Sequence, residues 1–260
     1  MHSRTTITAP RCACTRRFAM ALCIVPLLSS CTGGFDTLQQ DLTRAAQEQV
    51  MRTLAAQYSH RLGGAVEAVV NDLARPGGYL DNPLARILLP PPLGLALGVA
   101  RDLYADPQAA LLSVLINQAA EQAIPVAAPI LQTALAEITP AEARGLLDSG
   151  VGAGTGLLRS RTEAALKAAV RPRVATVLAG NDALRIHGEL LDAYRMQSAP
   201  AAPEAVSPPA GPAPDLEAHV TDNAVEGLFA VLAAREAAIR DDFERMTGGM
   251  LPGAGVPRRD

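Results

Sequence analysis

Side chains that could carry out chemistry are few in this 260-residue chain, and they are widely spaced. Beyond the first 30 residues there are three histidines, His60, His187 and His219, and none lies in an H-E-x-x-H or similar metal-binding pattern. No serine occupies a G-x-S-x-G nucleophile elbow. We therefore predict three separate surface or cap histidines, no catalytic residue, no metal site and no cofactor.

Two further patterns resemble functional motifs but do not match them fully. Asp102 and Asp106 could share one helix face as an acid/base pair, yet Asp106 precedes Pro107 and is better explained as a helix N-cap. The alternating glycines of residues 150–156 do not satisfy G-x-G-x-x-G, and no Gly-Lys-Ser/Thr follows them. We predict that they form a flexible connector rather than a phosphate cradle.

The clearest chemical signal is a cysteine at the end of an apolar N-terminal segment. Residues 1–30 contain four arginines and no acidic residue, and residues 18–28 form an apolar run with one proline. This pattern is typical of an export signal, and the run is shorter than the ~20 apolar residues of a membrane-spanning helix. The sequence LSSC, residues 28–31, resembles the bacterial lipobox, in which the cysteine becomes the first mature residue and carries acyl chains such as palmitate.

Lipid attachment at Cys31 would place the chain on a membrane of the cell envelope. The alternative is an ordinary export signal followed by a chance cysteine. Thr32 rather than aspartate follows the cysteine, which favours the periplasmic face of the outer membrane. The other three cysteines precede Cys31, so the mature chain could form no internal disulfide and could not use thiolate catalysis.

The composition of residues 31–260 limits the partners that we expect. This part of the chain has 19 basic and 26 acidic residues, a net charge of −7, and it lacks basic clusters. That balance argues against binding nucleic acid. The chain has no tryptophan, which argues against stacking platforms for bases or sugars. The expected partners are a membrane, through acyl chains on Cys31, and an unknown envelope protein.

Apolar residues recur at helical spacing through the mature chain, and strand-like alternation is nearly absent. We therefore predict an all-α fold: a single helical-bundle domain of about eight helices with an extended proline-rich loop, preceded by a lipoprotein signal. The expected segments are a signal peptide (1–30), a lipidated N-terminus and tether helix (31–61), a helical core (62–196), a Pro/Ala-rich linker (197–214), a C-terminal helix packing on the core (215–246) and a disordered tail (247–260).

Local signals indicate where helices begin and end. The glycine pair of residues 63–64 is expected to end the tether helix. The sequences TPAE (139–142) and SRTE (160–163) have the pattern of capping boxes and predict two helix starts. The charged residues between 235 and 245 are expected to form the solvated face of the last helix.

The most distinctive segment is RPGGYLDNPLARILLPPPLG, residues 75–94. Three prolines follow an apolar run there, so the backbone must be extended rather than helical. We expect this loop to pack across the helices, and the alternative is a docking surface for a partner. The residues that could form such an interaction loop are Tyr79, Asn82, Pro83, Ile87, Leu88, Leu89 and Pro90.

Several stretches together resemble a known family of bacterial exported proteins. They are GGYLDNP (77–83), ILLP (87–90), NQAAEQA (117–123), residues 139–147, residues 215–221 and residues 227–240. In this order they resemble the family called domain of unknown function 4197, over roughly residues 62–245. The chain departs from the family at Leu157-Leu158, where the family tends to have an aromatic pair. The resemblance implies a helical exported protein and supplies no activity or catalytic residue.

Three kinds of function are compatible with these observations. The favoured one is a membrane-anchored helical lipoprotein of the cell envelope that acts as a scaffold or adaptor through protein contacts. The first alternative is a carrier that holds an apolar ligand between its helices. The second is an enzyme with an unrecognised site, which would require Asp81, Asn82, Asp102 or His187 to converge in one cleft.

Overall fold

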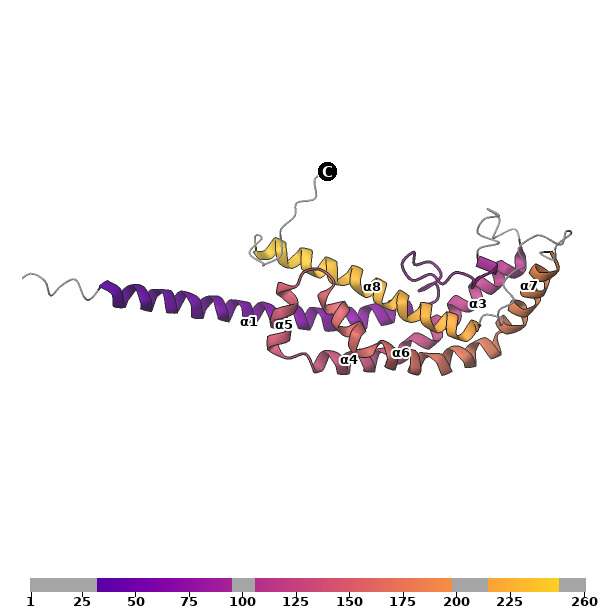
Figure 1. The fold of residues 1–260 in the computed structure, drawn as a ribbon, viewed down its shortest axis with the longest axis horizontal. Helices are drawn as coiled ribbons and strands as arrows, with labels where there is room; N and C mark the ends of the chain where they lie inside the picture. The colour runs from indigo at the N-terminus through magenta and orange to yellow at the C-terminus, as the bar shows by residue number, and fades with distance from the viewer. Residues whose placement is uncertain (1–31, 95–105, 198–214, 248–260) are drawn as a thin grey trace, which may run out of the picture. The chain divides into compact units, whose positions relative to one another are not determined.

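The computed structural model describes residues 32–94, 106–197 and 215–247, and within these ranges every regular element is a helix (Figure 1). The predicted all-α fold class is therefore confirmed for this part of the chain. The total of about eight helices stays a prediction, as do the lipoprotein signal and Cys31, which lie outside the described ranges. The elements are α1 (Thr32–Leu73), α3 (Pro107–Ala123), the 3-10 helix η1 (Ile124–Val126), α4 (Ala127–Ala136), α5 (Pro140–Asp148), α6 (Ala153–Gly180), α7 (Ala183–Gln197) and α8 (Leu216–Thr247).

The chain divides into two compact units, residues 1–48 and residues 49–260. In the first unit the described residues all belong to α1, and their side chains from residue 40 to 47 are exposed. Leu42, in the predicted tether helix, is 67 % exposed. In the second unit Val50 is still 57 % exposed, and the buried side chains of α1 begin with Ala55, Tyr58 and Leu62. No helix among the described residues is long and apolar enough to cross a bilayer.

Helices α1, α6 and α8 form the centre of the second unit. The Tyr58 and Phe243 rings of α1 and α8 meet edge to face at 6.4 Å, and Asp72 of α1 pairs with Arg235 of α8. The contacts run in opposite order along the two helices, which are therefore antiparallel. Polar contacts of α6 run from Gly154–Glu236 at one end to Arg171–Asp215, the residue before α8, at the other, so α6 is also antiparallel to α8.

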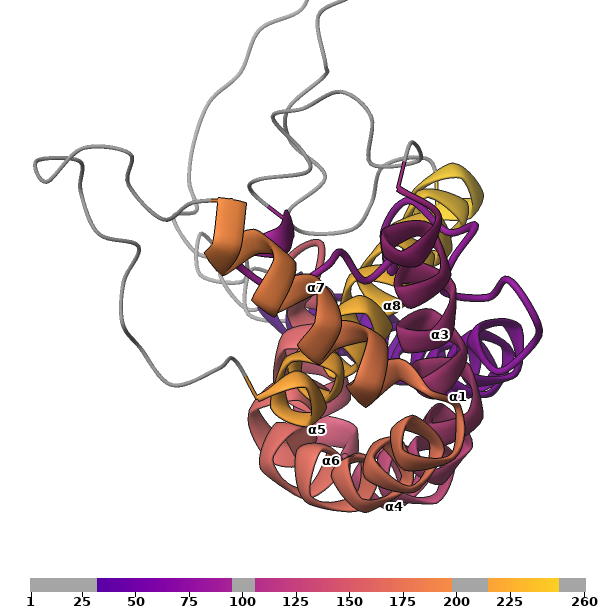
Figure 2. The same ribbon diagram turned by 90° about the vertical axis from the view of Figure 1, so that its right-hand side faces the viewer.

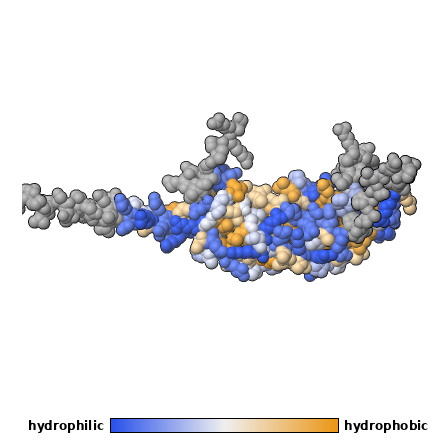
Figure 3. Space-filling view, in the orientation of Figure 1, coloured by the Kyte–Doolittle hydropathy of each residue, from blue (hydrophilic) through white to orange (hydrophobic). Residues whose placement is uncertain are grey.

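The remaining helices pack around α6. Helices α3, α4, α5 and α7 all contact it, and α7 also contacts α3. Figures 1 and 2 show α7 at one end of this unit, beside α3. On the face seen in Figure 3, apolar surface forms separate patches among polar side chains. Many apolar side chains of the described helices are buried in one core cluster.

Two of the predicted helix starts have the expected caps. The Asp106 carboxylate accepts a hydrogen bond from the backbone N–H of Gln108 at 2.8 Å, which confirms it as the N-cap of α3. At α5 the Thr139 hydroxyl accepts from the Glu142 N–H, and the Glu142 carboxylate accepts from the Thr139 N–H at 2.9 Å. Both caps satisfy backbone donors that a helix N-terminus leaves without an intrahelical partner.

Two other boundary predictions are wrong. Helix α1 continues through Gly63 and Gly64 to Leu73. A glycine in a helix costs roughly 1 kcal/mol, whereas burying a large apolar side chain contributes roughly 1.5–3 kcal/mol, and several follow the glycine pair. The SRTE sequence lies inside α6, where Ser160 donates to the Leu157 carbonyl instead of capping a helix.

Candidate functional site

The predicted interaction loop packs on the helices, as expected. Tyr79 and Ile87 are fully buried, Leu89 is 4 % exposed and Pro90 is buried as well. Most of the apolar side chains of this loop therefore belong to the core. Backbone hydrogen bonds close the turns of the loop between residues 75 and 86 and join Gly94 to Pro90, whereas the Ile87 N–H bonds a side chain of a neighbouring helix.

Asn117 of α3 supplies two of these partners to a single residue of the loop. Its Oδ1 accepts from the Ile87 N–H at 2.9 Å, and its Nδ2 donates to the Ile87 carbonyl at 2.9 Å. The same Nδ2 also donates to the Ser113 carbonyl at 2.8 Å. Asn117 is fully buried, and its amide pairs with Ile87 as a neighbouring β-strand would.

Further side chains hold the loop on both sides of Ile87. The Glu121 carboxylate accepts from the Tyr79 N–H at 3.2 Å, and the Tyr79 hydroxyl donates to the Ala224 carbonyl of α8 at 2.8 Å. Burial, aided by the charge of Glu121, raises the pKa of the Tyr79 hydroxyl. His219 of α8 lies with its Nε2 2.8 Å from the Leu88 carbonyl oxygen. Contacts from two helices thus fix the loop in one conformation.

Two leucines of the loop nevertheless remain exposed. Leu84 is 53 % exposed and Leu88 is 65 % exposed. Pro83 is also exposed, and Asn82 is half-buried with its Oδ1 accepting from the Leu84 N–H at 3.0 Å. The predicted set is therefore divided: Tyr79, Ile87, Leu89 and Pro90 anchor the loop, whereas Pro83 and Leu88 face outward, together with Leu84.

A second polar centre is buried between α1, α6 and α8. Glu236 has no exposed surface, and its carboxylate accepts from the Tyr58 hydroxyl at 2.6 Å. It also accepts from the Gly154 N–H at 3.0 Å, and from the N–H and hydroxyl of Thr155 at 2.7 and 2.6 Å. Burial alone would raise the pKa of this carboxyl, but the hydrogen bonds from Thr155, Tyr58 and Gly154 outweigh it and hold the pKa below its usual value.

Arg240 completes this centre. Its guanidinium lies 3.5 Å from the Glu236 carboxylate, donates to the carbonyls of Leu146 and Leu147 in α5, and sits 5.2 Å from the centre of the Tyr58 ring. The expectation that these charges belong to a solvated face is therefore wrong for Glu236 and Arg240. Their spacing from Leu232 continues the buried stripe of α8, and that was the signal that could have identified them.

The glycines of residues 150–156 form the N-terminus of α6, which lies against the Glu236 carboxylate. Gly152 is the N-cap residue at φ 83°, and the helix starts at Ala153, so residues 153–156 are helical rather than a flexible connector. A Cβ on Gly154 would lie 2.6 Å from the Tyr58 hydroxyl. The first amides of a helix attract anions, and here the anion is a side chain of the same protein.

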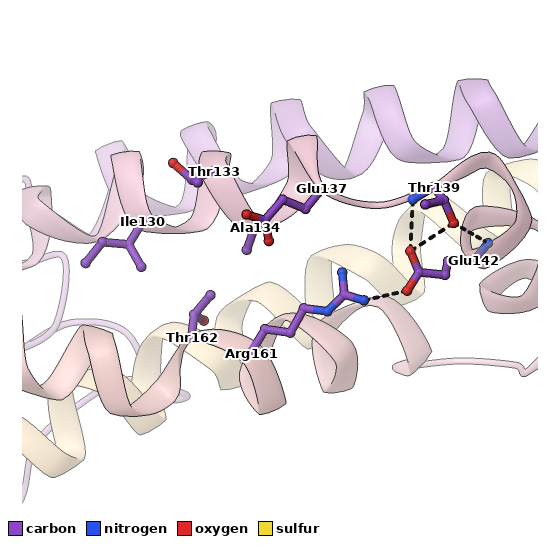
Figure 4. A pocket seen from close by; sticks show the side chains of 8 residues that line it. All are labelled: Ile130, Thr133, Ala134, Glu137, Thr139, Glu142, Arg161 and Thr162. Carbon is purple, nitrogen blue, oxygen red and sulfur yellow. Dashed lines mark hydrogen bonds and ion pairs between the residues drawn. The ribbon is translucent and has the colours of Figure 1, made fainter.

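A shallow open pocket of about 760 Å³ lies between α4, α5 and α6 (Figure 4). Arg161 forms an ion pair with Glu142, whose carboxylate also accepts from Thr139. The hydrogen bonds from Thr139 and Arg161 lower the pKa of Glu142. In this pocket the side chains of Thr139, Glu142 and Arg161 therefore bond to one another. The lining residues are Ile130, Thr133, Ala134, Glu137, Thr139, Glu142, Arg161 and Thr162.

The histidines are arranged differently from the prediction. His60 is exposed, but His187 is only 5 % exposed, and burial lowers the pKa of its ring. Among the residues described here, no three His, Cys, Asp or Glu side chains are grouped to hold a metal ion. No contact found in these residues joins Asp81 or Asn82 to His187, and Asp102 lies outside the described ranges.

Comparison with known proteins identifies a family. A family model described as "Protein of unknown function (DUF4197)" matches residues 59–252. No curated protein and no solved structure matches the chain. The matched region contains the loop, His187 and the Glu236 centre except Tyr58, which lies one residue before it, and Cys31 also lies before it.

Proposed function

The chain belongs to the DUF4197 family, and we propose that it is a lipid-anchored adaptor of the bacterial cell envelope that binds a partner protein through its proline-rich loop. The observation that supports this proposal is the exposure of Leu84 and Leu88 on a loop whose backbone is hydrogen-bonded by the buried side chains of Asn117 and Glu121. The contact surface consists of Pro83, Leu84 and Leu88.

A fixed loop is suited to binding because little conformational entropy remains to be lost. Ordering the backbone of one residue costs roughly 1–2 kcal/mol of conformational free energy. Because Asn117, Glu121 and His219 already order the loop in the folded protein, binding does not have to supply that free energy. Burying a leucine side chain against a partner contributes roughly 1.5–3 kcal/mol. Two leucines presented in this way supply an apolar centre for an interface, around which polar contacts can form.

The anchor is part of the same proposal. Acyl chains on Cys31 would hold the protein at the periplasmic face of the outer membrane and confine its search for a partner to that surface. Each buried methylene contributes about 0.8 kcal/mol, so two or more chains give stable attachment. The net negative charge of the mature chain gives no electrostatic attraction to anionic lipid, so attachment depends on these chains.

The two alternatives receive less support from the contacts described above. An apolar carrier needs a mostly apolar, enclosing cavity, whereas the pocket in Figure 4 is open and contains Glu137, Glu142 and Arg161. An enzyme needs reactive groups that converge where a substrate can reach them. The buried polar group around Glu236 is shielded from solvent, and its carboxylate is fully hydrogen-bonded.

Site-specific photo-crosslinking tests the proposal. A photoreactive amino acid is placed at Leu84 or Leu88 of the full chain and irradiated in native membranes, and the adducts are identified by mass spectrometry. The matched control is Val151, which is 66 % exposed in the turn before α6. We expect one defined protein at both loop positions and its absence at Val151.

Binding of the identified protein must then depend on the loop. Leu88→Asp is expected to weaken the affinity of the purified partner by about tenfold or more, because a buried carboxylate replaces an apolar contact. Val151→Asp is expected to leave it unchanged. Adducts that are the same at all three positions, or equal affinities for the two variants, would rule out the loop as the binding site.

A further inference from the structure

The threonine hydroxyls that line the pocket between α4, α5 and α6 have already donated their protons. The Thr133 hydroxyl donates to the Pro129 carbonyl at 2.8 Å, and the Thr162 hydroxyl donates to the Leu158 carbonyl at 2.7 Å. The third hydroxyl, that of Thr139, donates to a carboxylate at 3.0 Å. Because a hydroxyl carries one proton, none of the three has a hydrogen-bond donor left for a ligand.

The charged side chains of the lining leave the pocket with an excess of negative charge. The lining contains one basic residue, Arg161, and two acidic residues, Glu137 and Glu142. Arg161 forms an ion pair with Glu142 at the side of the pocket formed by α5, as Figure 4 shows. This pair is neutral as a whole, so the charge that a ligand meets in the rest of the pocket is that of Glu137.

Glu137 lies where a helix end also favours a positive charge. It is the C-cap residue of α4, and its side chain is exposed, so a ligand can reach the carboxylate. The last carbonyl groups of a helix carry a partial negative charge that attracts cations. The carboxylate and the end of α4 therefore act in the same direction. In Figure 4 the Glu137 side chain projects from α4 into the space between α4 and α6.

Apolar side chains continue from Glu137 along the same face of α4. Ile130 and Ala134 precede it by seven and three residues, a spacing that places all three on one side of a helix, and all three line the pocket. A ligand with a short alkyl chain can lie along this face with its polar end at Glu137. An anion would be repelled there, and a purely apolar ligand would desolvate the carboxylate without giving it a partner.

We propose that this pocket binds the ammonium group of an alkyl amine, with the ammonium at the Glu137 carboxylate and the alkyl chain on Ile130 and Ala134. An ammonium group brings three N–H donors and a positive charge, which are the features that the lining lacks. A small organic amine and the lysine side chain of a peptide both carry this group on an alkyl chain. None of the residues that line the pocket belongs to the proline-rich loop, so the proposal does not depend on the adaptor function.

An NMR titration of the full chain with n-butylammonium chloride tests the proposal. The methyl resonances of Ile130 and Ala134 are followed while sodium chloride keeps the ionic strength constant, because salt screens exposed charges. Butan-1-ol and sodium butyrate are the matched probes, since they have the same number of carbon atoms without a positive charge. We expect saturable shifts with butylammonium and an affinity about tenfold weaker, or weaker still, for the other two probes.

Two variants connect the binding to Glu137. Glu137→Gln keeps the size of an exposed side chain, so the fold should be retained, and it should weaken butylammonium binding by about tenfold. Glu226→Gln removes an exposed carboxylate on α8, outside the pocket, and should leave the affinity unchanged.

The source of the ammonium group is tested with the tripeptide Ala-Lys-Ala. Tighter binding of the tripeptide than of butylammonium would support a lysine side chain as the natural ligand, and weaker binding would support a small amine. Shifts that do not saturate, equal affinities for butylammonium, butanol and butyrate, or an unchanged affinity in Glu137→Gln would each overturn the proposed site.

Discussion

At the scale of single residues, Glu236 shows how this protein buries a charge. Three side-chain and two backbone groups surround the carboxylate, and they come from α1, α6 and α8 itself. Burying a carboxylate is costly unless it is paired and hydrogen-bonded, and here both conditions are met. The centre fixes the contact of three helices that are far apart in sequence.

Glu236→Gln should therefore destabilise the fold strongly. The amide keeps the size of the side chain but removes the charge and places an NH₂ group against donors, so we expect the free energy of unfolding to fall by about 3 kcal/mol. Urea denaturation at neutral pH measures the change. Glu226→Gln on the same helix removes an exposed pair with Arg159 and should change stability little. Equal losses in the two variants would contradict a special role for the buried carboxylate.

Glu236→Gln also tests how the stability of the protein depends on pH. The folded pKa of Glu236 lies below its usual value, so its contribution is present above the unfolded pKa of about 4.3 and is lost as the pH falls through the folded pKa. The unchanged protein should lose stability over that range, and Glu236→Gln should lose less. Urea midpoints compared at neutral pH and below pH 4 give the difference. Parallel losses would show that another carboxyl dominates acid unfolding.

The sequence contained part of the information on this centre. Positions 236 and 240 continue the four-residue spacing of the buried stripe from Leu232, but a charged residue on such a stripe is usually solvated. What makes burial tolerable is Tyr58, 178 positions away, and Thr155, 81 positions away. Such partners are set by tertiary packing, and no local pattern encodes them.

At the scale of elements, capping patterns predicted the starts of two helices correctly. Asp106 and Thr139 cap helices as expected. The pattern failed at Ser160 and at Gly63-Gly64, because burial of flanking apolar side chains outweighs a local preference of about 1 kcal/mol. The loop was recognisable from its prolines, whereas its attachment to Asn117, Glu121 and His219 required the folded structure.

Gly227 of α8 tests how closely the loop approaches that helix. A Cβ at this position would lie 2.9 Å from the Ala85 Cα and 3.1 Å from the Ala85 carbonyl oxygen, so the loop backbone would have to shift. Gly227→Ala should lower the free energy of unfolding by about 1–3 kcal/mol, despite the better helix propensity of alanine. Thermal and urea denaturation measure it.

The matched control is Gly145→Ala in α5. Nothing lies within 4 Å of a Cβ there, so alanine should raise stability by about 0.5–1 kcal/mol. Opposite signs for the two substitutions would support the close approach of the loop to α8. Stabilisation by both would show that the loop can move away at no cost, and it would weaken the argument that a fixed loop presents Leu84 and Leu88.

At the scale of the whole molecule, the decisive feature is Cys31, which precedes the region matched to the family. If acyl chains are attached there, the intact mass of the mature protein should exceed that of residues 31–260 by the mass of a diacylglycerol and an amide-linked acyl chain. Cys31→Ser removes the sulfur atom to which the lipid would be attached. The variant should therefore move from the membrane fraction to the aqueous phase of a detergent partition.

The fold should not depend on the anchor, because the described core of the second unit contains no residue before Ala55. Cys31→Ser is therefore expected to retain the helical circular dichroism and the urea midpoint of the unchanged protein while losing membrane attachment. Crosslinking at Leu88 should then fall in membranes because the partner and the loop no longer share one surface. The lipid anchor would be rejected if Cys31→Ser stays in the membrane fraction, or if the unchanged protein has an unmodified mass. Binding of a partner through the loop would then have to occur without an anchor.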